Sequence, residues 1–222
     1  YKRQIQDIAD MKAEANWGPA YCLAEIPCCD LNGDVVAYMF VYQRGQGPAK
    51  AYGEIAAEVK QGRKEYAQAE KELSKAAKQS ENNNTPMVLP DDPMIPTPMN
   101  PTPEYVKAYV KKDAARKKMS GAGNYGYLII SARYDRNPIP VIGHGLPEFF
   151  SRGDLIKAKA ADKAGQNAQL QRIYLAGPSQ RWYEFQGNDG QKVTVEGNTL
   201  QEDGVDNIQA AMTYIAQRDA TE

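Results

Sequence analysis

Three cysteines and a single histidine are the residues that could together carry out nucleophilic chemistry: Cys22, Cys28, Cys29 and His144. A thiolate paired with an imidazole is the machinery of a thiol hydrolase, in which the histidine activates the cysteine. No catalytic-cysteine signature surrounds any of the three, however, and all lie in a strand-like run, where a free cysteine usually acts as a small hydrophobic residue. The sequence therefore favours inert thiols over a catalytic pair.

The same residues limit metal binding and disulfide formation. The chain has no CxxC pair, and one histidine cannot complete a typical zinc site. Adjacent Cys28 and Cys29 cannot comfortably bridge to each other, although one bridge from Cys22 across a turn is allowed. We expect no metal, no cofactor, no catalytic residue and no disulfide framework, and cysteine usage alone leaves the cellular compartment open.

Two further motifs have simpler structural explanations. Residues 30–34 (DLNGD) resemble the start of a calcium loop, but Val41 occupies the twelfth place, where such loops carry glutamate. Asn-Gly between two apolar runs predicts a hairpin turn instead. Residues 121–126 (GAGNYG) match a dinucleotide-binding pattern, yet they precede a strand rather than follow one, so phosphate-binding geometry is not expected.

A basic helix is predicted after a proline-rich stretch. Its cations could bind phosphates or anionic lipid, since such clusters release counterions on binding. They spread around the helix with little aromatic interleaving, so a solvated face is favoured. These cations are Lys107, Lys111, Lys112, Arg116, Lys117 and Lys118.

Residues 135–150 (DRNPIPVIGHGLPEFF) combine prolines that fix a bend with two glycines that flank His144. This segment either packs as a corner of a sheet or forms a preordered loop, with an apolar tip, that enters the cleft of a partner protein. Both interpretations stay open. Under the second, the candidate partner-binding residues are Asn137, Pro138, Ile139, Pro140, His144, Gly145, Leu146 and Pro147.

Composition narrows the class of protein. The 222 residues include 27 Lys and Arg against 28 Asp and Glu, a formal net charge of −1 that argues against a dedicated nucleic-acid binder. No run approaches the ~18 consecutive apolar residues of a membrane span. The chain begins at Tyr1 without methionine and shows no signal-peptide core, which predicts a processed or trimmed chain.

The hydrophobic periodicity predicts an α+β fold, in which an antiparallel sheet with hairpins packs against several helices and a Pro-rich segment is irregular. A long helix is expected to be interrupted near Gly62. The elements expected in the first part, residues 1–80, are a helix over 1–16, strands over 20–29 and 34–43, the second of them central in its sheet, and the long helix over 49–80.

Residues 81–103 hold seven of the fourteen prolines, which predicts an extended linker or arm. The third part, residues 104–222, is expected to share one sheet with the first. Ser151 is expected to cap a helix that Gly165 ends. The other elements expected there are a helix from Pro103 or Glu104 to Met119, strands over 125–134, 169–176, 180–186 and 191–196, and a helix over 203–217.

The run YGYLIISARYDRNPIPVIGHG resembles the motif of streptopain-type propeptides and their free-standing inhibitor relatives. That motif is an aromatic-rich strand, then a proline-containing loop, then Pro-Val-(Leu/Ile)-Gly. The flanking stretches DLNGDVVAYMFVY and RIYLAGPSQRWYEF are also similar to strands of secreted proteins that carry such a domain ahead of a papain-fold peptidase. The matching residues are Gly126, Tyr127, Ile129, Ile130, Ser131, Ala132, Pro140, Val141, Ile142 and Gly143.

This resemblance implies a noncatalytic α+β domain of a bacterial or archaeal protein, secreted or placed at the cell surface or in the periplasm. Its implied partner is a cysteine peptidase domain, in the same precursor chain or in a separate protein, which it keeps inactive or helps to fold. The chain departs from the family in its Pro-rich insertion at residues 81–103 and in having no peptidase domain within its 222 residues. The alternatives are an extracellular binding or adaptor module with a Pro-rich arm and a small thiol enzyme.

Overall fold

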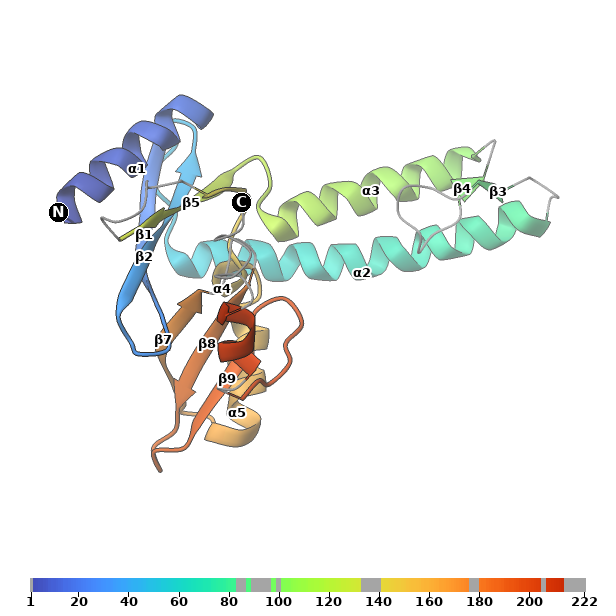
Figure 1. Cartoon of the computed structure of the whole chain (residues 1–222). Coiled ribbons are helices and arrows are strands. Elements are labelled where there is room, and N and C mark those ends of the chain that lie inside the picture. The colour runs from blue at the N-terminus through green and yellow to red at the C-terminus, as the bar shows by residue number, and fades with distance from the viewer. Residues whose placement is uncertain are drawn as a thin grey trace. The chain divides into compact units, whose positions relative to one another are not determined.

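The computed structural model describes residues 2–82, 87–88, 97–98, 101–132, 141–175, 180–204 and 207–213. The chain divides into two compact units, one made of residues 1–50 and 123–222 and the other of residues 51–122 (Figure 1). The first unit carries a mainly antiparallel sheet together with helices, so the predicted α+β class is confirmed.

The sheet of the first unit has the strand order β6-β5-β2-β1-β7-β8-β9. All neighbours are antiparallel except β1 and β7, which meet in parallel at the single registered pair Cys29 and Tyr174. Strand β2 lies between β1 and β5, so its predicted central position is confirmed. The elements of this unit are α1 (Lys2–Trp17), β1 (Ala20–Cys29), β2 (Val35–Arg44), β5 (Tyr125–Ser131), β6 (Val141–His144), α4 (Glu148–Ser151), α5 (Gly153–Ala164), β7 (Gln169–Leu175), β8 (Arg181–Gln186), β9 (Lys192–Glu196) and a short helix at residues 207–213.

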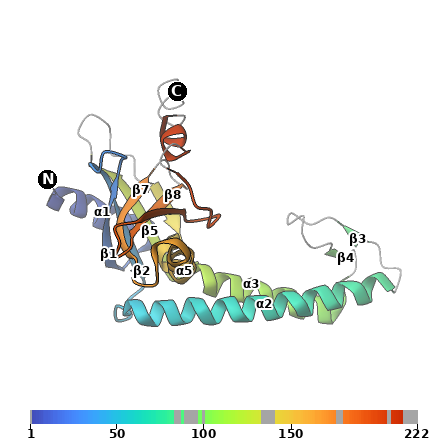
Figure 2. The ribbon, with the colours of Figure 1, turned by 90° about the horizontal axis from the view of Figure 1, so that it is seen from below.

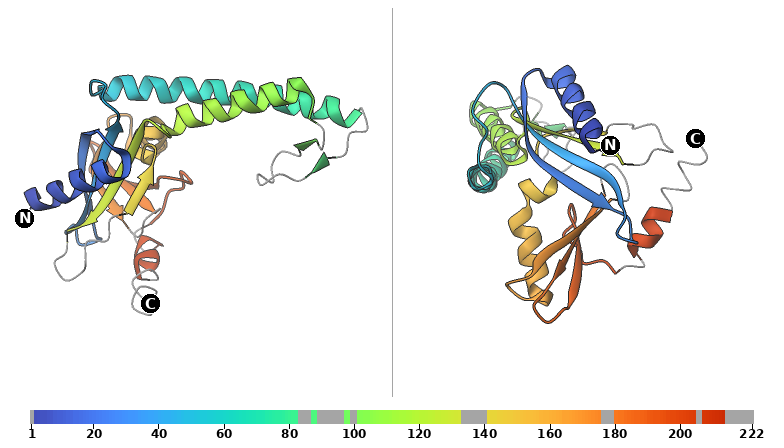
Figure 3. Two further views of the ribbon diagram at one scale, coloured as in Figure 1. Left: turned by 90° about the horizontal axis from the view of Figure 1, so that it is seen from above. Right: turned by 90° about the vertical axis from the view of Figure 1, so that its left-hand side faces the viewer.

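Helix α1 covers the part of the sheet that contains β2 and β5. Ile5, Ala9 and Ala13 stand four residues apart, so they form one buried face of the helix. That face packs against side chains of the two strands, among them Phe40 and Leu128. Figure 3 shows α1 lying along the hairpin of β1 and β2.

The turn between β1 and β2 is the predicted hairpin rather than a calcium loop. The Asp30 carboxylate accepts hydrogen bonds from the backbone N–H groups of Asn32 and Asp34 at 2.9 and 3.0 Å. Gly33 adopts a φ of 88°, which favours glycine. No group of three or more metal-ligating side chains occurs among the described residues.

The helix expected to start at a Ser151 cap is divided into two. Ser151 ends α4, and its hydroxyl donates to the Pro147 carbonyl at 3.2 Å, so it is engaged with the preceding turn and does not cap α5. Arg152 separates the two helices, and the predicted cap is wrong. The predicted end is confirmed, because Gly165 follows the last residue of α5.

The second unit is a helical hairpin of α2 (Tyr52–Asn82) and α3 (Pro103–Ser120), with a short pair of strands, β3 (Met87–Val88) and β4 (Thr97–Pro98). Figure 2 shows the two helices side by side. Thr102 caps α3 by accepting from the Tyr105 N–H at 3.2 Å. Of the predicted Pro-rich arm, most residues lie outside the described part of the chain.

A heptad-like seam explains why α2 and α3 pair. Their facing residues recur at alternating intervals of three and four, the spacing of a coiled coil. Most residues of the buried cluster between the helices are alanines, which lets the helices approach closely. Lys112 lies over the Tyr66 ring, and one buried cluster combines Leu73, Ala76, Ala77, Tyr105 and Ala108.

Helix α2 continues through Gly62, so the expected interruption there is wrong. A Cβ on Gly62 would lie 2.7 Å from the Met119 backbone nitrogen, closer than real contacts allow. The glycine therefore permits close contact between α2 and α3 and does not break the helix. Within the described part of the chain, no helix is long and apolar enough to span a membrane.

Candidate binding site

The described part of the quoted motif forms strands β5 and β6, which pair antiparallel at one end of the sheet, and Ala132 directly follows β5. Pro140 lies outside the described residues. Strand β5 lies between β2 and β6, and its Leu128 and Ile130 are fully buried. Strand β6 is the edge strand, and its Ile142 side chain is 38% exposed. The motif thus provides one core strand and one edge strand with an exposed apolar side chain.

Both glycines of the motif are explained by aromatic rings placed directly on them. A Cβ on Gly143 would lie 2.2 Å from the ring of Tyr127, its cross-strand partner on β5. A Cβ on Gly126 would lie 2.5 Å from the ring of Trp17 at the end of α1. Any larger residue at either position would displace a ring, so the ring on Gly143 fixes the β6 backbone against β5.

A buried ion pair contacts the Tyr127 ring that lies on this edge strand. The Arg181 side chain on β8 is 1% exposed, and its Nε and Nη2 atoms each donate to the Glu148 carboxylate on α4 at 2.6 Å. The Arg181 guanidinium also lies 5.1 Å from the centre of the Tyr127 ring. Burial alone would lower the pKa of Arg181, but the Glu148 carboxylate more than offsets it, so the net shift is upward and the charge is retained.

The ion pair belongs to a larger aromatic cluster. The Tyr183 hydroxyl donates to the Glu148 carboxylate at 3.4 Å, and Phe149 stacks on the Tyr183 ring with centroids 5.9 Å apart. Burial raises the pKa of Tyr183, so its hydroxyl stays protonated and able to donate. The cluster links β5, β8 and α4 around the segment that follows β6.

The structure describes half of the candidate partner-binding residues. His144 is exposed at the end of β6, whereas Gly145 and Leu146 are buried, Leu146 with 8% of its surface exposed. The Gly145 N–H donates to the Tyr125 carbonyl at 3.0 Å, and Pro147 directly precedes α4. The loop interpretation required an exposed apolar tip at Leu146 and Pro147, and this tip is not formed, because both residues are buried. Asn137, Pro138, Ile139 and Pro140 lie outside the described residues.

The thiols are not arranged for catalysis with His144. The register places His144 opposite Gly126, Gly126 opposite Tyr42 and Tyr42 opposite Cys22, so three strand spacings, roughly 14 Å, separate the histidine from the nearest cysteine in this row. Burial raises the pKa of Cys28 to about 12 and also raises the pKa of both other thiols. All three cysteines are free.

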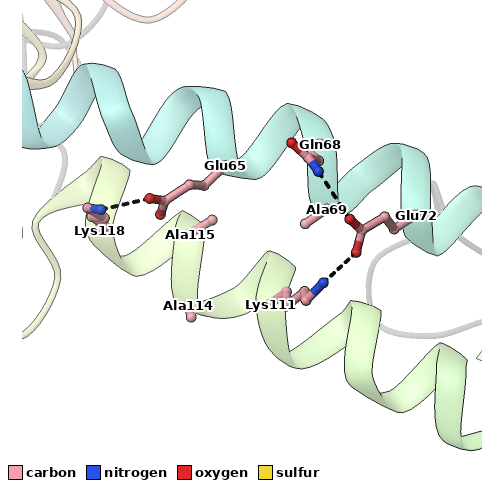
Figure 4. A pocket seen from close by; sticks show the side chains of 8 residues that line it. All are labelled: Glu65, Gln68, Ala69, Glu72, Lys111, Ala114, Ala115 and Lys118. Atoms are coloured by element: carbon pink, nitrogen blue, oxygen red, sulfur yellow. Dashed lines mark hydrogen bonds and ion pairs between the residues drawn. The ribbon is translucent and has the colours of Figure 1, made fainter.

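A groove of about 450 Å³ runs between α2 and α3 within the second unit (Figure 4). Its charged side chains pair with one another: Lys118 with Glu65 at 2.9 Å and Lys111 with Glu72 at 2.8 Å. Lys111 and Lys118 thus pair with α2, and the groove presents no unpaired charge to a ligand. The solvated-face interpretation is wrong for Lys112, which is buried over the Tyr66 ring.

The Arg181–Glu148 pair is the feature that sequence reasoning missed. An arginine next to a run of aromatic residues (RWYEF) on a strand was a signal of a buried cation. Its partner lies 33 positions away, and nothing in the local pattern identifies it.

Comparison with known proteins gives no match: no protein-family model, no curated protein and no solved structure matches the chain. The resemblance to streptopain-type propeptides therefore rests on the motif residues alone.

Proposed function

We propose that this chain is a noncatalytic domain of a secreted protein that binds a papain-fold cysteine peptidase and blocks its cleft or assists its folding. The observation that carries the proposal is the β5–β6 pair. The described motif residues form a buried strand and an exposed edge strand, the Tyr127 ring lies on Gly143 of the edge strand, and the buried Arg181–Glu148 pair contacts that ring. A rigid, preordered surface is what a steric inhibitor needs, since it loses little entropy on binding.

The geometry also supports a noncatalytic role. The exposed His144 has no cysteine within hydrogen-bonding distance in its row of the sheet, and the thiols are held protonated by burial. Both features disfavour the thiol-enzyme alternative, because a nucleophilic cysteine needs a lowered pKa and an adjacent base.

The proposal is tested with the purified full chain against mature streptopain, papain and a set of streptopain-type peptidases. Hydrolysis of a fluorogenic peptide is measured at rising concentrations of the chain, and refolding yield of each denatured peptidase is measured with and without it. We expect inhibition or improved refolding of at least one streptopain-type peptidase. A folded chain that neither inhibits nor assists any of them overturns the proposal.

Deleting residues 137–147 is not a suitable test of the mechanism. It removes strand β6 and the buried Leu146, so loss of inhibition would report loss of the fold. Substituting the exposed His144 by alanine keeps the strand, so inhibition by this variant can be measured instead. Urea denaturation can verify that its stability is unchanged.

The second candidate function is an extracellular adaptor module, which one observation favours. Helix α3 exposes three neighbouring apolar side chains near the Pro-rich segment: Val106 at 46%, Tyr109 at 55% and Val110 at 61%. An adaptor would inhibit no cysteine peptidase and would lose its partner when residues 86–103 are removed. The inhibition measurements above therefore separate the two functions.

A further inference from the structure

The open edges of the sheet differ in how they are protected. An edge strand exposes unpaired backbone groups, and proteins usually block it with prolines, charges, bulges or a covering segment. At β9 the chain covers its own edge: the Glu196 N–H donates to the Gln201 carbonyl at 2.9 Å and the Asp203 N–H to the Thr194 carbonyl at 3.1 Å. This edge is closed to a partner.

Strands β1 and β7 have open edges because they meet at only one registered pair. The Ala132 N–H donates to the Val36 carbonyl, so the backbone groups of even-numbered β2 residues point toward β5. The β1 residues opposite them therefore do not bond to β2, and their backbone N–H and C=O groups point to the open side of β1. These residues are Ala20, Cys22, Glu25 and Pro27. A bulge between Cys22 and Ala24 interrupts this row, Glu25 adds a charge and Pro27 has no N–H. Strand β7 carries a bulge before Arg172. Each of these two edges therefore carries at least one such protection.

Among the residues that the structure describes, the edge of β6 has none of these protections. The Gly145 N–H donates to the Tyr125 carbonyl, and hydrogen-bonded residues alternate along an antiparallel pair. In this register the backbone groups of Val141 and Gly143 therefore bond to β5. The backbone groups of Ile142 and His144 consequently point outward, and both side chains are exposed. Strand β6 contains no proline and no acidic or lysine residue, and no described segment pairs with its outer side.

The number of available hydrogen bonds indicates the kind of occupant. Two outward residues offer at most four backbone hydrogen bonds, too few to offset the entropy lost when two free proteins associate. A pairing of two copies through β6 alone would therefore be weak. The edge is suited to a partner that contacts further surface of this unit or is linked in one precursor chain, where the effective concentration is high.

We propose that the outer edge of β6 binds an extended segment of the peptidase domain as an additional β-strand, a proposal that rests on the function proposed above. Backbone bonds to Ile142 and His144 supply the recognition, and the exposed Ile142 side chain contacts an apolar residue of the added strand. The Tyr127 ring on Gly143 holds the edge in place for this pairing.

The test compares Ile142→Pro with Ile142→Ala in the full chain. Proline removes the outward N–H without breaking a bond to β5, whereas alanine keeps that N–H and shortens the side chain. The inhibition constant is measured with mature streptopain and with the most strongly inhibited enzyme of the panel. We expect Ile142→Pro to weaken inhibition at least tenfold and more than Ile142→Ala does, with both variants unfolding in urea near the wild-type midpoint.

A second measurement keeps the proposal falsifiable if the proline variant is unstable. Amide hydrogen exchange of the wild-type chain is followed by NMR with and without the peptidase. Exchange at Ile142 and His144 is expected to slow on binding, while Val141 and Gly143 are protected in both states. Inhibition with unchanged exchange at Ile142 and His144, or with full potency of a folded Ile142→Pro chain, overturns strand addition and leaves the proposed function standing.

Two other outcomes would overturn the proposed function or the proposed occupant of the β6 edge. If no peptidase binds the wild-type chain, the proposed function and the strand addition both fail. If sedimentation velocity instead shows a dimer of this chain that Ile142→Pro converts to a monomer, the occupant of the edge is a second copy and not a peptidase segment.

Discussion

At the scale of single residues, the Arg181–Glu148 pair stabilises the first unit only while both charged side chains are present and hydrogen-bonded to each other. Removing two charges from water is costly, and their mutual attraction compensates only because two hydrogen bonds of 2.6 Å join them. Replacing one partner leaves the other buried and unpaired, whereas replacing both by apolar residues leaves no such charge. The pair should therefore respond very differently to single and double substitution.

We expect Glu148→Met to lower the free energy of unfolding by about 3 kcal/mol, because it leaves the Arg181 guanidinium buried without a counter-ion. The double variant Arg181→Met with Glu148→Met should recover more than half of that loss. Urea denaturation at neutral pH measures both. Equal destabilisation by the single and double variants would show that the side-chain shapes matter and the charges do not.

The three thiols provide a second prediction at this scale. Burial raises the pKa of Cys28 to about 12, so almost none of it is thiolate at pH 7.5. The exposed Cys22 also has a raised pKa. We expect iodoacetamide to label Cys22 no faster than free cysteine and Cys28 only after unfolding, as peptide mapping would show. Rapid labelling of a single site in the folded chain would instead favour the thiol-enzyme alternative.

At the scale of elements, the second unit depends on how closely α2 and α3 approach. Gly62 lies against the Met119 backbone, which cannot move aside as a flexible side chain would. Gly53, on the same helix, has no heavy atom within 4 Å of its Cβ position and is a matched control.

We expect Gly62→Ala to destabilise the helical hairpin by about 1–3 kcal/mol through overpacking, although alanine is the better helix former. Gly53→Ala should be neutral or slightly stabilising. Thermal unfolding followed by circular dichroism compares the two variants. If Gly62→Ala raised the melting temperature, the close helix contact would be wrong.

Several elements could be predicted from sequence because their signals are local. The hydrophobic periodicity of residues 49–80 predicted α2, and Asn32-Gly33 predicted the hairpin. The division between α4 and α5 could not be predicted, since Ser151 looks like a cap and only the structure shows its hydroxyl bonded to Pro147.

The candidate site was predictable only in part for the same reason. Strand β5 was predicted within the run 125–134, whereas β6 was not predicted as a strand. Its edge position depends on strand order, which pairing between distant segments determines. The burial of Leu146 likewise depends on packing contributed by other elements, and no local pattern encodes it.

At the scale of the whole molecule, each unit has a core of its own. One cluster in the first unit joins α1 to β2 and β5, and the cluster in the second unit joins α2 to α3. Segments with separate cores commonly open as separate cooperative units. A substitution that strains one core should therefore leave amide protection in the other unchanged.

The variant Gly62→Ala tests this independence. We expect hydrogen exchange measured by mass spectrometry to accelerate across α2 and α3, while peptides covering β5 and β8 exchange as in the wild-type chain. Glu148→Met should give the reverse pattern, because its buried pair belongs to the first unit. Equal acceleration in both units from either substitution would mean that the chain unfolds as one cooperative body. The proposed binding edge at β6 would then be sensitive to any destabilising change in the helical hairpin, whereas independent units would let the hairpin vary without altering the edge.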